Sequence, residues 1–284
     1  MAGLLSGLAG LGLDNLENME IYETPKKEEA VVKEAVVEIP RVEEKDLIYD
    51  KTFECPVCGE SFVSKIMKTG KAKLLTTDQD LRAVYEGIDA VKYDVQLCPH
   101  CGYAALSRYF STMTSAQAKL IRENISKNVH LHVYHDETYS YEEALERYRL
   151  ALANAVVKRG KASEKAYICL KSAWLVRGYQ EELVTSKEQQ EKLEELKKME
   201  EEYLFNAFNG FVEARQTELF PMCGMDEKTI DYLIAALAMR FKKYEVASKL
   251  VASILTSPSA NARTKDKARE LKEQILEGLK NQRN

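Results

Sequence analysis

The sequence has few cysteines and no long apolar run, and each shortage excludes a class of protein. Only six of the 284 residues are cysteines, and four of these form two Cys-x-x-Cys pairs. In a chain without a secretory signal, this spacing favours metal binding over a disulfide framework. Residues 1–13 are apolar and glycine-rich, but they lack a basic start and are too short to span a bilayer. We therefore expect a reducing, cytoplasmic setting and no stable membrane anchor.

Common catalytic and nucleotide-binding motifs are also missing. The chain has no Gly-x-x-x-x-Gly-Lys run, no Gly-x-Gly-x-x-Gly after a strand and no Gly-x-Ser-x-Gly turn. This lowers the expectation of an enzyme. Cys169 and Cys223, outside the two pairs, are expected to be inert thiols because neither has an evident base partner.

Charge and composition divide the chain into three regions. The first 50 residues hold 5 Lys and Arg against 12 Asp and Glu, so the acidity of the chain lies there. Residues 1–47 are poor in aromatic residues and are expected to form a flexible tail and linker. Residues 48–112 combine both cysteine pairs with β-prone runs and glycines, which predicts a small zinc ribbon-like module. Residues 113–284 show helical spacing of apolar residues and are predicted to form a helical domain.

The apolar periodicity of this last region predicts seven helices. They cover residues 115–127, 141–158, 163–179, 187–218, 227–240, 243–256 and 262–280. Four of them begin after a residue that can cap a helix: Thr114, Ser140, Ser186 and Asp226. The expected fold class is mainly α, a helical array with a small N-terminal zinc ribbon-like α+β module and a disordered N-terminal tail.

The two cysteine pairs are metal-binding knuckles of one type. In Cys55-Pro-Val-Cys58 and in Cys98-Pro-His-Cys101, two thiolates can face one ion, and the glycine that follows each pair permits a tight turn. Four thiolates complete a tetrahedron and leave no position for water or substrate. We predict one structural Zn²⁺ at these four cysteines, with redox-active dithiols or an iron site as the alternatives. His100, inside the second knuckle, is not needed as a ligand.

The segment from Tyr139 to Leu152 resembles the second helix of a tetratricopeptide repeat. In that family, aromatic and small residues at fixed spacing let paired helices approach closely. The matching positions here are Tyr141, Ala144, Tyr148, Ala151 and Leu152, and a second set is Tyr244, Ala247, Val251, Ile254 and Leu255. The resemblance implies a helical array whose concave face binds a protein or peptide. A helical scaffold that only supports the zinc module is the alternative.

Taken together, the two knuckles and the tetratricopeptide-like helices are similar to a bacterial family known only as a domain of unknown function. The resemblance covers about residues 48–256, and its most specific parts are 55–59 and 98–104. It implies zinc binding and a bacterial cytoplasmic setting. It implies no activity.

A histidine cluster is the other group that resembles a metal site. His130, His132 and His135 could bind a second metal or supply a general base. Their spacing matches no known catalytic zinc motif, so polar residues in a turn between helices are the favoured interpretation.

Basic residues gather in two places. After the first knuckle, a solvated hairpin face is favoured over phosphate contact because acidic residues nearly balance Lys65, Lys68, Lys71 and Lys73. Residues 240–284 hold 11 basic and 5 acidic residues, and we regard them as the best surface for nucleic acid or an acidic partner. The basic residues of this C-terminal segment are concentrated at Arg263, Lys265, Lys267, Arg269 and Lys272. The acidic segment 17–44 could compete for this surface as a tethered ligand.

These patterns predict a zinc-binding, non-enzymatic adaptor that recognises a protein or peptide on its concave helical face. A nucleic-acid-binding zinc-ribbon protein is the first alternative, with nucleic acid a less favoured partner. A metal- or thiol-dependent enzyme is the second.

Overall fold

The computed structural model describes residues 42–284, except for 133, 135, 185–189 and 284. The described residues belong to one compact unit. The helices are α1 (Ser115–Ile121), α2 (Tyr141–Val157), α3 (Ala162–Val184), α4 (Gln190–Thr217), α5 (Glu227–Arg240), α6 (Tyr244–Thr256) and α7 (Ala262–Arg283). The strands are β1 (Ile48–Glu54), β2 (Ser61–Met67), β3 (Leu74–Thr77), β4 (Ala83–Tyr85), β5 (Val95–Leu97) and β6 (Ala104–Leu106).

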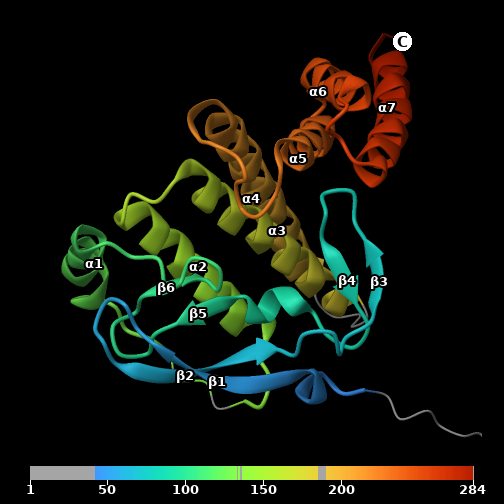
Figure 1. Ribbon diagram of the computed structural model, residues 1–284. Helices are drawn as coiled ribbons and strands as arrows, with labels where there is room; N and C mark the ends of the chain where they lie inside the picture. The colour runs from blue at the N-terminus through green and yellow to red at the C-terminus, as the bar shows by residue number, and fades with distance from the viewer. Residues whose placement is uncertain (1–41, 133, 135, 185–189, 284) are drawn as a thin grey trace, which may run out of the picture. The chain divides into compact units, whose positions relative to one another are not determined.

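The strands form three separate antiparallel hairpins, β1–β2, β3–β4 and β5–β6. In the first, Glu54 pairs with Ser61, and in the third, Leu97 pairs with Ala104. The residues between these paired ends are the two cysteine knuckles, so each knuckle is the tip of a hairpin. The β3–β4 hairpin carries no knuckle and projects toward the C-terminal helices (Figure 1).

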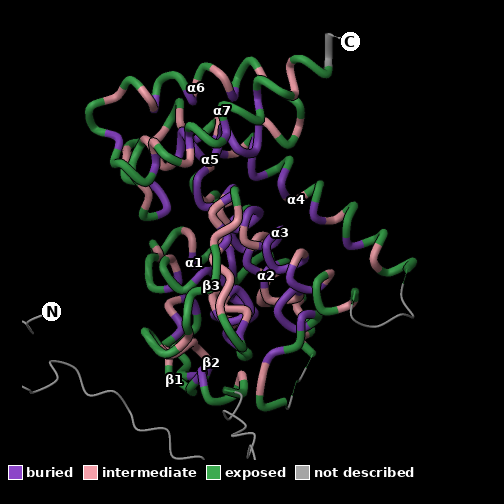
Figure 2. Tube along the Cα trace, turned by 90° about the vertical axis from the view of Figure 1, so that its right-hand side faces the viewer, coloured by how far each residue is buried: buried purple, intermediate pink, exposed green. Residues whose placement is uncertain are grey.

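The helices build on these hairpins in a continuous series. Helix α2 packs on β5 and β6 and also on α3, which in turn packs along α4. Helices α5, α6 and α7 follow as a second group (Figure 1). Buried residues concentrate along α2, α3 and α5, and residues of the β5–β6 hairpin belong to the same core (Figure 2). The β5–β6 hairpin and the helices therefore share apolar packing.

The mainly helical fold class predicted from sequence is confirmed, and the strands form small antiparallel sheets. Thr114 forms a full capping box, and Ser140 and Asp226 accept the expected N–H groups. The predicted helix 115–127 is α1 followed by a π-helical segment, Arg122–Ser126 (η5), and α3 continues past the predicted end at 179.

Some expectations lie beyond what the structure describes or tests. Most of the predicted tail, the cap at Ser186 and the start of the fourth helix at 187 fall outside the described residues. Residues 44–47, expected to be linker, form a 3-10 turn (η3) with Leu47 buried. The domain boundaries at 47/48 and 112/113 stay predictions.

The tetratricopeptide-like arrangement also stays a prediction. Tyr141, Ala144, Tyr148 and Ala151 are buried, as a repeat helix requires. Their helix, however, packs on the β5–β6 hairpin and the 3-10 turn Ala90–Tyr93 (η4) as well as on α3. None of the described helices combines the length and the apolarity needed to cross a bilayer.

Candidate metal centre

The tips of the β1–β2 and β5–β6 hairpins bring the four predicted cysteines together. The sulfur atoms all lie within 4.8 Å of one another. Cys55 Sγ lies 3.6 Å from Cys101 Sγ, and Cys58 Sγ lies 3.7 Å from Cys98 Sγ. These distances are far longer than a disulfide bond, and they approach the edge of about 3.8 Å that a tetrahedron with Zn–S bonds near 2.3 Å would have.

Both knuckles are closed by the same two backbone hydrogen bonds. The amide of the first cysteine donates to the carbonyl five residues later, and the glycine amide donates back to the carbonyl of the first cysteine. The bonds are Cys55 N to Glu60 O (3.0 Å), Gly59 N to Cys55 O (2.8 Å), Cys98 N to Tyr103 O (2.8 Å) and Gly102 N to Cys98 O (3.0 Å). Each glycine has a positive φ, +81° at Gly59 and +72° at Gly102, which favours glycine over residues with a Cβ.

Side chains from the helical region hold both knuckles in place. The Arg122 guanidinium, in η5, donates to the carbonyl of Val57 in the first knuckle at 2.7 Å. Asn154 on α2 donates through Nδ2 to the carbonyl of Gly102 in the second knuckle at 3.0 Å, in a buried position. Neither residue is recognisable from the sequence, because no local motif links it to a knuckle 52 or more positions away.

The site is largely enclosed by an aromatic cluster. Cys55, Cys98 and Cys101 are at most 5% exposed, and Cys58 is exposed. Tyr103 is fully buried next to the site and donates its hydroxyl to the Phe110 carbonyl. The remaining cluster residues include Val57, Phe62, Phe110, Ala118 and Ile121. Three buried sulfurs and one at the surface suit a structural ion better than a reacting one.

Electrostatics within the cluster favour the anionic form of one sulfur. Hydrogen bonds from the thiols of Cys101 and Cys98 lower the pKa of Cys55 to about 2. The same hydrogen bond with Cys55 raises the pKa of Cys101 above its usual range. A bound cation would replace the shared protons, because only thiolates serve as ligands. The arrangement can therefore hold a metal ion, and an all-sulfur set is typical of zinc or iron.

His130 and His132, the described members of the histidine cluster, are not part of a comparable group. His132 Nδ1 lies 2.7 Å from Glu146 Oε2, and Tyr134 donates to the same oxygen. His130 Nδ1 contacts the backbone carbonyl of Asn128, and His135 lies outside the described residues. Across the described part of the chain, the four cysteines are the only group of three or more potential ligands that lie close together.

The two remaining cysteines are buried thiols. Burial raises the pKa of Cys169 to about 11. Burial also raises the pKa of Cys223, whose thiol donates to the carbonyl of Ser163. Both thiols therefore stay protonated at neutral pH, which makes them poor nucleophiles.

Comparison with known proteins places the chain in a family. A family model described as "Uncharacterized protein conserved in bacteria (DUF2225)" matches residues 48–275. The match runs from the start of β1 into α7, so it contains both knuckles and most of the helical region. Comparison with curated proteins and with solved structures gives no match.

Proposed function

Because the chain belongs to DUF2225, a bacterial family without an assigned activity, we propose its function from its own geometry: a non-enzymatic cytoplasmic adaptor with one structural zinc ion. The four-sulfur cluster supports the zinc assignment, because its sulfur spacing fits a tetrahedral ion and its walls leave little room for a substrate. The ion would stabilise the two hairpin tips against α1 and α2 rather than react. Recognition would then belong to the helical surface.

The observation that carries the adaptor proposal is a groove of about 570 Å³ formed by α2, α3 and α4. Leu152, Ala166 and Tyr203 contribute apolar surface to it, and Val156 on its edge is 57% exposed. Charged residues of both signs line it as well: Arg149, Lys165, Glu202 and Glu213. An apolar floor with a rim of mixed charge is the usual form of a groove that binds an amphipathic helix.

The dimensions of the groove fit such a helix. Its lining on α4 runs from Met199 to Glu213 along one face of the helix, a length of about 21 Å at 1.5 Å per residue. A partner helix of about four turns would cover this length. A Cβ added at Gly210 would lie only 2.9 Å from the Ala166 Cβ. Helices α3 and α4 therefore approach closely below the groove. We therefore commit to an amphipathic helix of a partner protein as the occupant.

A photo-crosslinker at position 156 tests this proposal in the full-length chain. Benzoylphenylalanine in place of Val156 should crosslink to one amphipathic helical segment, and a synthetic peptide of that segment should bind the purified protein with one-to-one stoichiometry. Asn206→Trp fills the groove from an exposed position on α4 and should abolish both results. The matched control is the same crosslinker at Leu276, which is 48% exposed on α7. Crosslinks at 156 that persist with Asn206→Trp, or that equal those at 276, would refute the adaptor proposal.

Nucleic-acid binding is a second candidate, supported by the surface of α7. Arg263, Lys265, Lys267 and Lys272 have no carboxylate within 4.0 Å among residues that the structure describes, whereas Arg269 pairs with Asp266. Unpaired basic residues on one helix can contact phosphates. Affinity for single-stranded DNA should then fall steeply with salt and fall further in Lys265→Gln/Lys272→Gln. If the affinity for DNA is weak and unchanged by this double substitution, α7 is excluded as the interface.

A further inference from the structure

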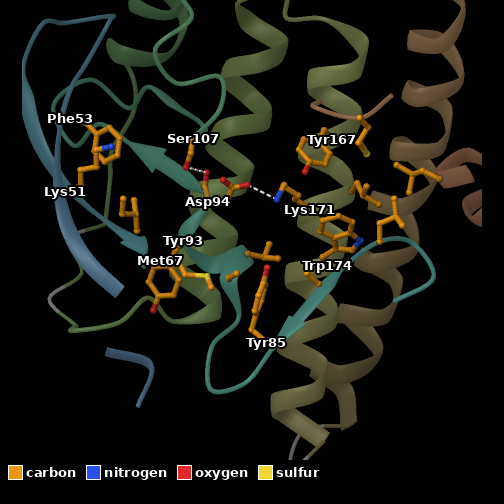
Figure 3. Close-up of a pocket in the computed structure, with 18 residues that line it drawn as sticks. Lys51, Phe53, Met67, Tyr85, Tyr93, Asp94, Ser107, Tyr167, Lys171 and Trp174 are labelled. Atoms are coloured by element: carbon orange, nitrogen blue, oxygen red, sulfur yellow. Dashed lines mark hydrogen bonds and ion pairs between the residues drawn. The ribbon is translucent and has the colours of Figure 1, made fainter. Parts of the chain in front are cut away.

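A separate cavity of about 600 Å³ lies where the β1–β2 and β3–β4 hairpins meet α3 and α5 (Figure 3). Of its eighteen lining residues, fourteen are apolar or aromatic, which suits the body of a small organic ligand. Its aromatic members are Phe53, Tyr85, Tyr93, Tyr167 and Trp174. The volume lies within the range typical of ligand pockets.

One ion pair interrupts this apolar lining. Lys171 Nζ lies 2.8 Å from Asp94 Oδ2, as Figure 3 shows. The same ammonium lies 5.0 Å from the ring centre of Tyr167 and 5.5 Å from that of Trp174. Burial alone would lower the pKa of Lys171, but Asp94 and Tyr167 raise it above its ordinary value, so the side chain stays charged.

A second hydrogen-bond donor in the cavity wall lacks an acceptor. The indole Nε1 of Trp174 is buried and has no hydrogen-bond partner among the described residues. Trp174 follows Lys171 by three positions on α3, so both side chains lie on one face of the helix. Buried N–H groups are normally satisfied, so this one marks a part of the cavity wall that must move before an oxygen atom can reach it.

We propose that this cavity binds an amphipathic organic anion, with an aromatic or branched apolar body against the aromatic wall and a carboxylate at Lys171. An anion fits better than a cation for two reasons. Lys51 and Lys171 outnumber Asp94 among the lining residues, and the Lys171 ammonium already lies over the ring faces that would otherwise attract a cationic ligand.

The chain offers a direct reporter, because Trp174 is its only tryptophan. We would titrate the full-length, metal-loaded protein with anthracene-9-carboxylate, which absorbs in the region of tryptophan emission. Binding should quench Trp174 in a saturable manner and give sensitised anthracene emission. The neutral anthracene-9-carboxamide should bind about tenfold more weakly or worse, because it cannot form a charge-assisted hydrogen bond with Lys171.

Matched variants separate a built site from general hydrophobic adsorption. Lys171→Met should weaken carboxylate binding about tenfold or more and remove the preference over the carboxamide, whereas Lys171→Arg should retain much of both. Ala83→Phe, which fills the cavity from β4, should abolish binding of both probes. Lys249→Met is the control, because Lys249 is an exposed lysine on α6 that lines neither this cavity nor the α2–α4 groove.

Two outcomes would overturn the proposal. One is the absence of saturable quenching up to the solubility of the probe. The other is equal binding of carboxylate and carboxamide that survives Ala83→Phe. If Lys171→Met alters the circular dichroism spectrum, the carboxamide comparison and Ala83→Phe still decide the question.

Discussion

Replacing each knuckle glycine by alanine should lower the free energy of unfolding by different amounts, although the two sequence motifs are alike. Gly59 and Gly102 occupy the same position after their cysteines and have similar positive φ values. At Gly59 an added Cβ would meet nothing within 4 Å. At Gly102 it would lie 2.6 Å from Val129 Cγ1 and 3.1 Å from Val129 Cγ2. The two alanines therefore share a backbone cost, and only the second adds a steric one.

The two costs can be estimated separately. A non-glycine residue in the left-handed region costs about 1–2 kcal/mol, which is the full effect expected for Gly59→Ala. Overpacking against a neighbour adds about 1–3 kcal/mol, so Gly102→Ala should lower the free energy of unfolding by about 2–5 kcal/mol in total. The β-branched Val129 has few side-chain rotamers with which to move away.

Urea unfolding of the metal-loaded variants, followed by circular dichroism, would measure both values. Val129→Ala removes the two methyl groups that the new Cβ would meet, so the double variant Gly102→Ala/Val129→Ala should recover the steric part. The coupling energy between positions 102 and 129 should be about 1–3 kcal/mol. Equal losses at the two glycines, or no coupling with Val129, would refute this description of the second knuckle.

Four further substitutions test the metal centre, one of its supports and a separate ion-pair network around Arg177. Cys98→Ser should abolish the single bound zinc ion per chain, as measured by elemental analysis of protein purified without a metal-affinity tag, whereas His132→Ala should leave it bound; a second metal that depends on His132 would contradict this assignment. Asn154→Ala should lower the free energy of unfolding in urea by about 1–3 kcal/mol, because it leaves the buried Gly102 carbonyl without its side-chain donor. An unchanged midpoint would show that water replaces the amide. Arg177→Met should lower the free energy of unfolding by about 3–5 kcal/mol, because it removes the cation from three carboxylates that lie within 3 Å of it. A change near zero would mean that these carboxylates become protonated or hydrated.

The parts of the fold that the sequence predicts well depend on neighbouring residues. Helix starts such as Thr114 and Asp226 follow from capping chemistry within four positions, and the structure confirms them. The four cysteines were found because each knuckle is a short motif. Pairing the two knuckles needed only the tetrahedral requirement for four ligands.

The parts that the sequence could not predict depend on contacts between distant segments. Asp94 and Lys171 are 77 positions apart, and neither belongs to a local pattern that indicates a cavity. Periodicity predicted the helix 163–179, which contains Trp174, but it could not show that the indole N–H lacks an acceptor. The tetratricopeptide-like spacing on α2 shows the same limit, because small and aromatic residues that would suit a partner helix also suit packing on a β-hairpin.

The β5–β6 hairpin connects the metal centre to the cavity. Its tip is the second knuckle, and at its base both the amide and the hydroxyl of Ser107 donate to the carbonyl of Asp94. Three residue pairs separate tip from base, a distance of about 10 Å. Asp94 in turn holds Lys171 on α3. Loss of the metal should therefore loosen the position of Asp94 and the wall around Trp174.

Trp174 emission can report this coupling without any ligand. Chelating the proposed zinc ion from wild-type protein should increase collisional quenching of Trp174 by acrylamide, and adding zinc back should reverse the change. In Cys98→Ser the chelator should have no effect, which separates metal loss from action of the chelator elsewhere. If quenching stays the same after elemental analysis shows that the metal is gone, the hairpin is held by its contacts with α2 alone, because Asn154 and the apolar faces of β5 and β6 do not depend on the ion.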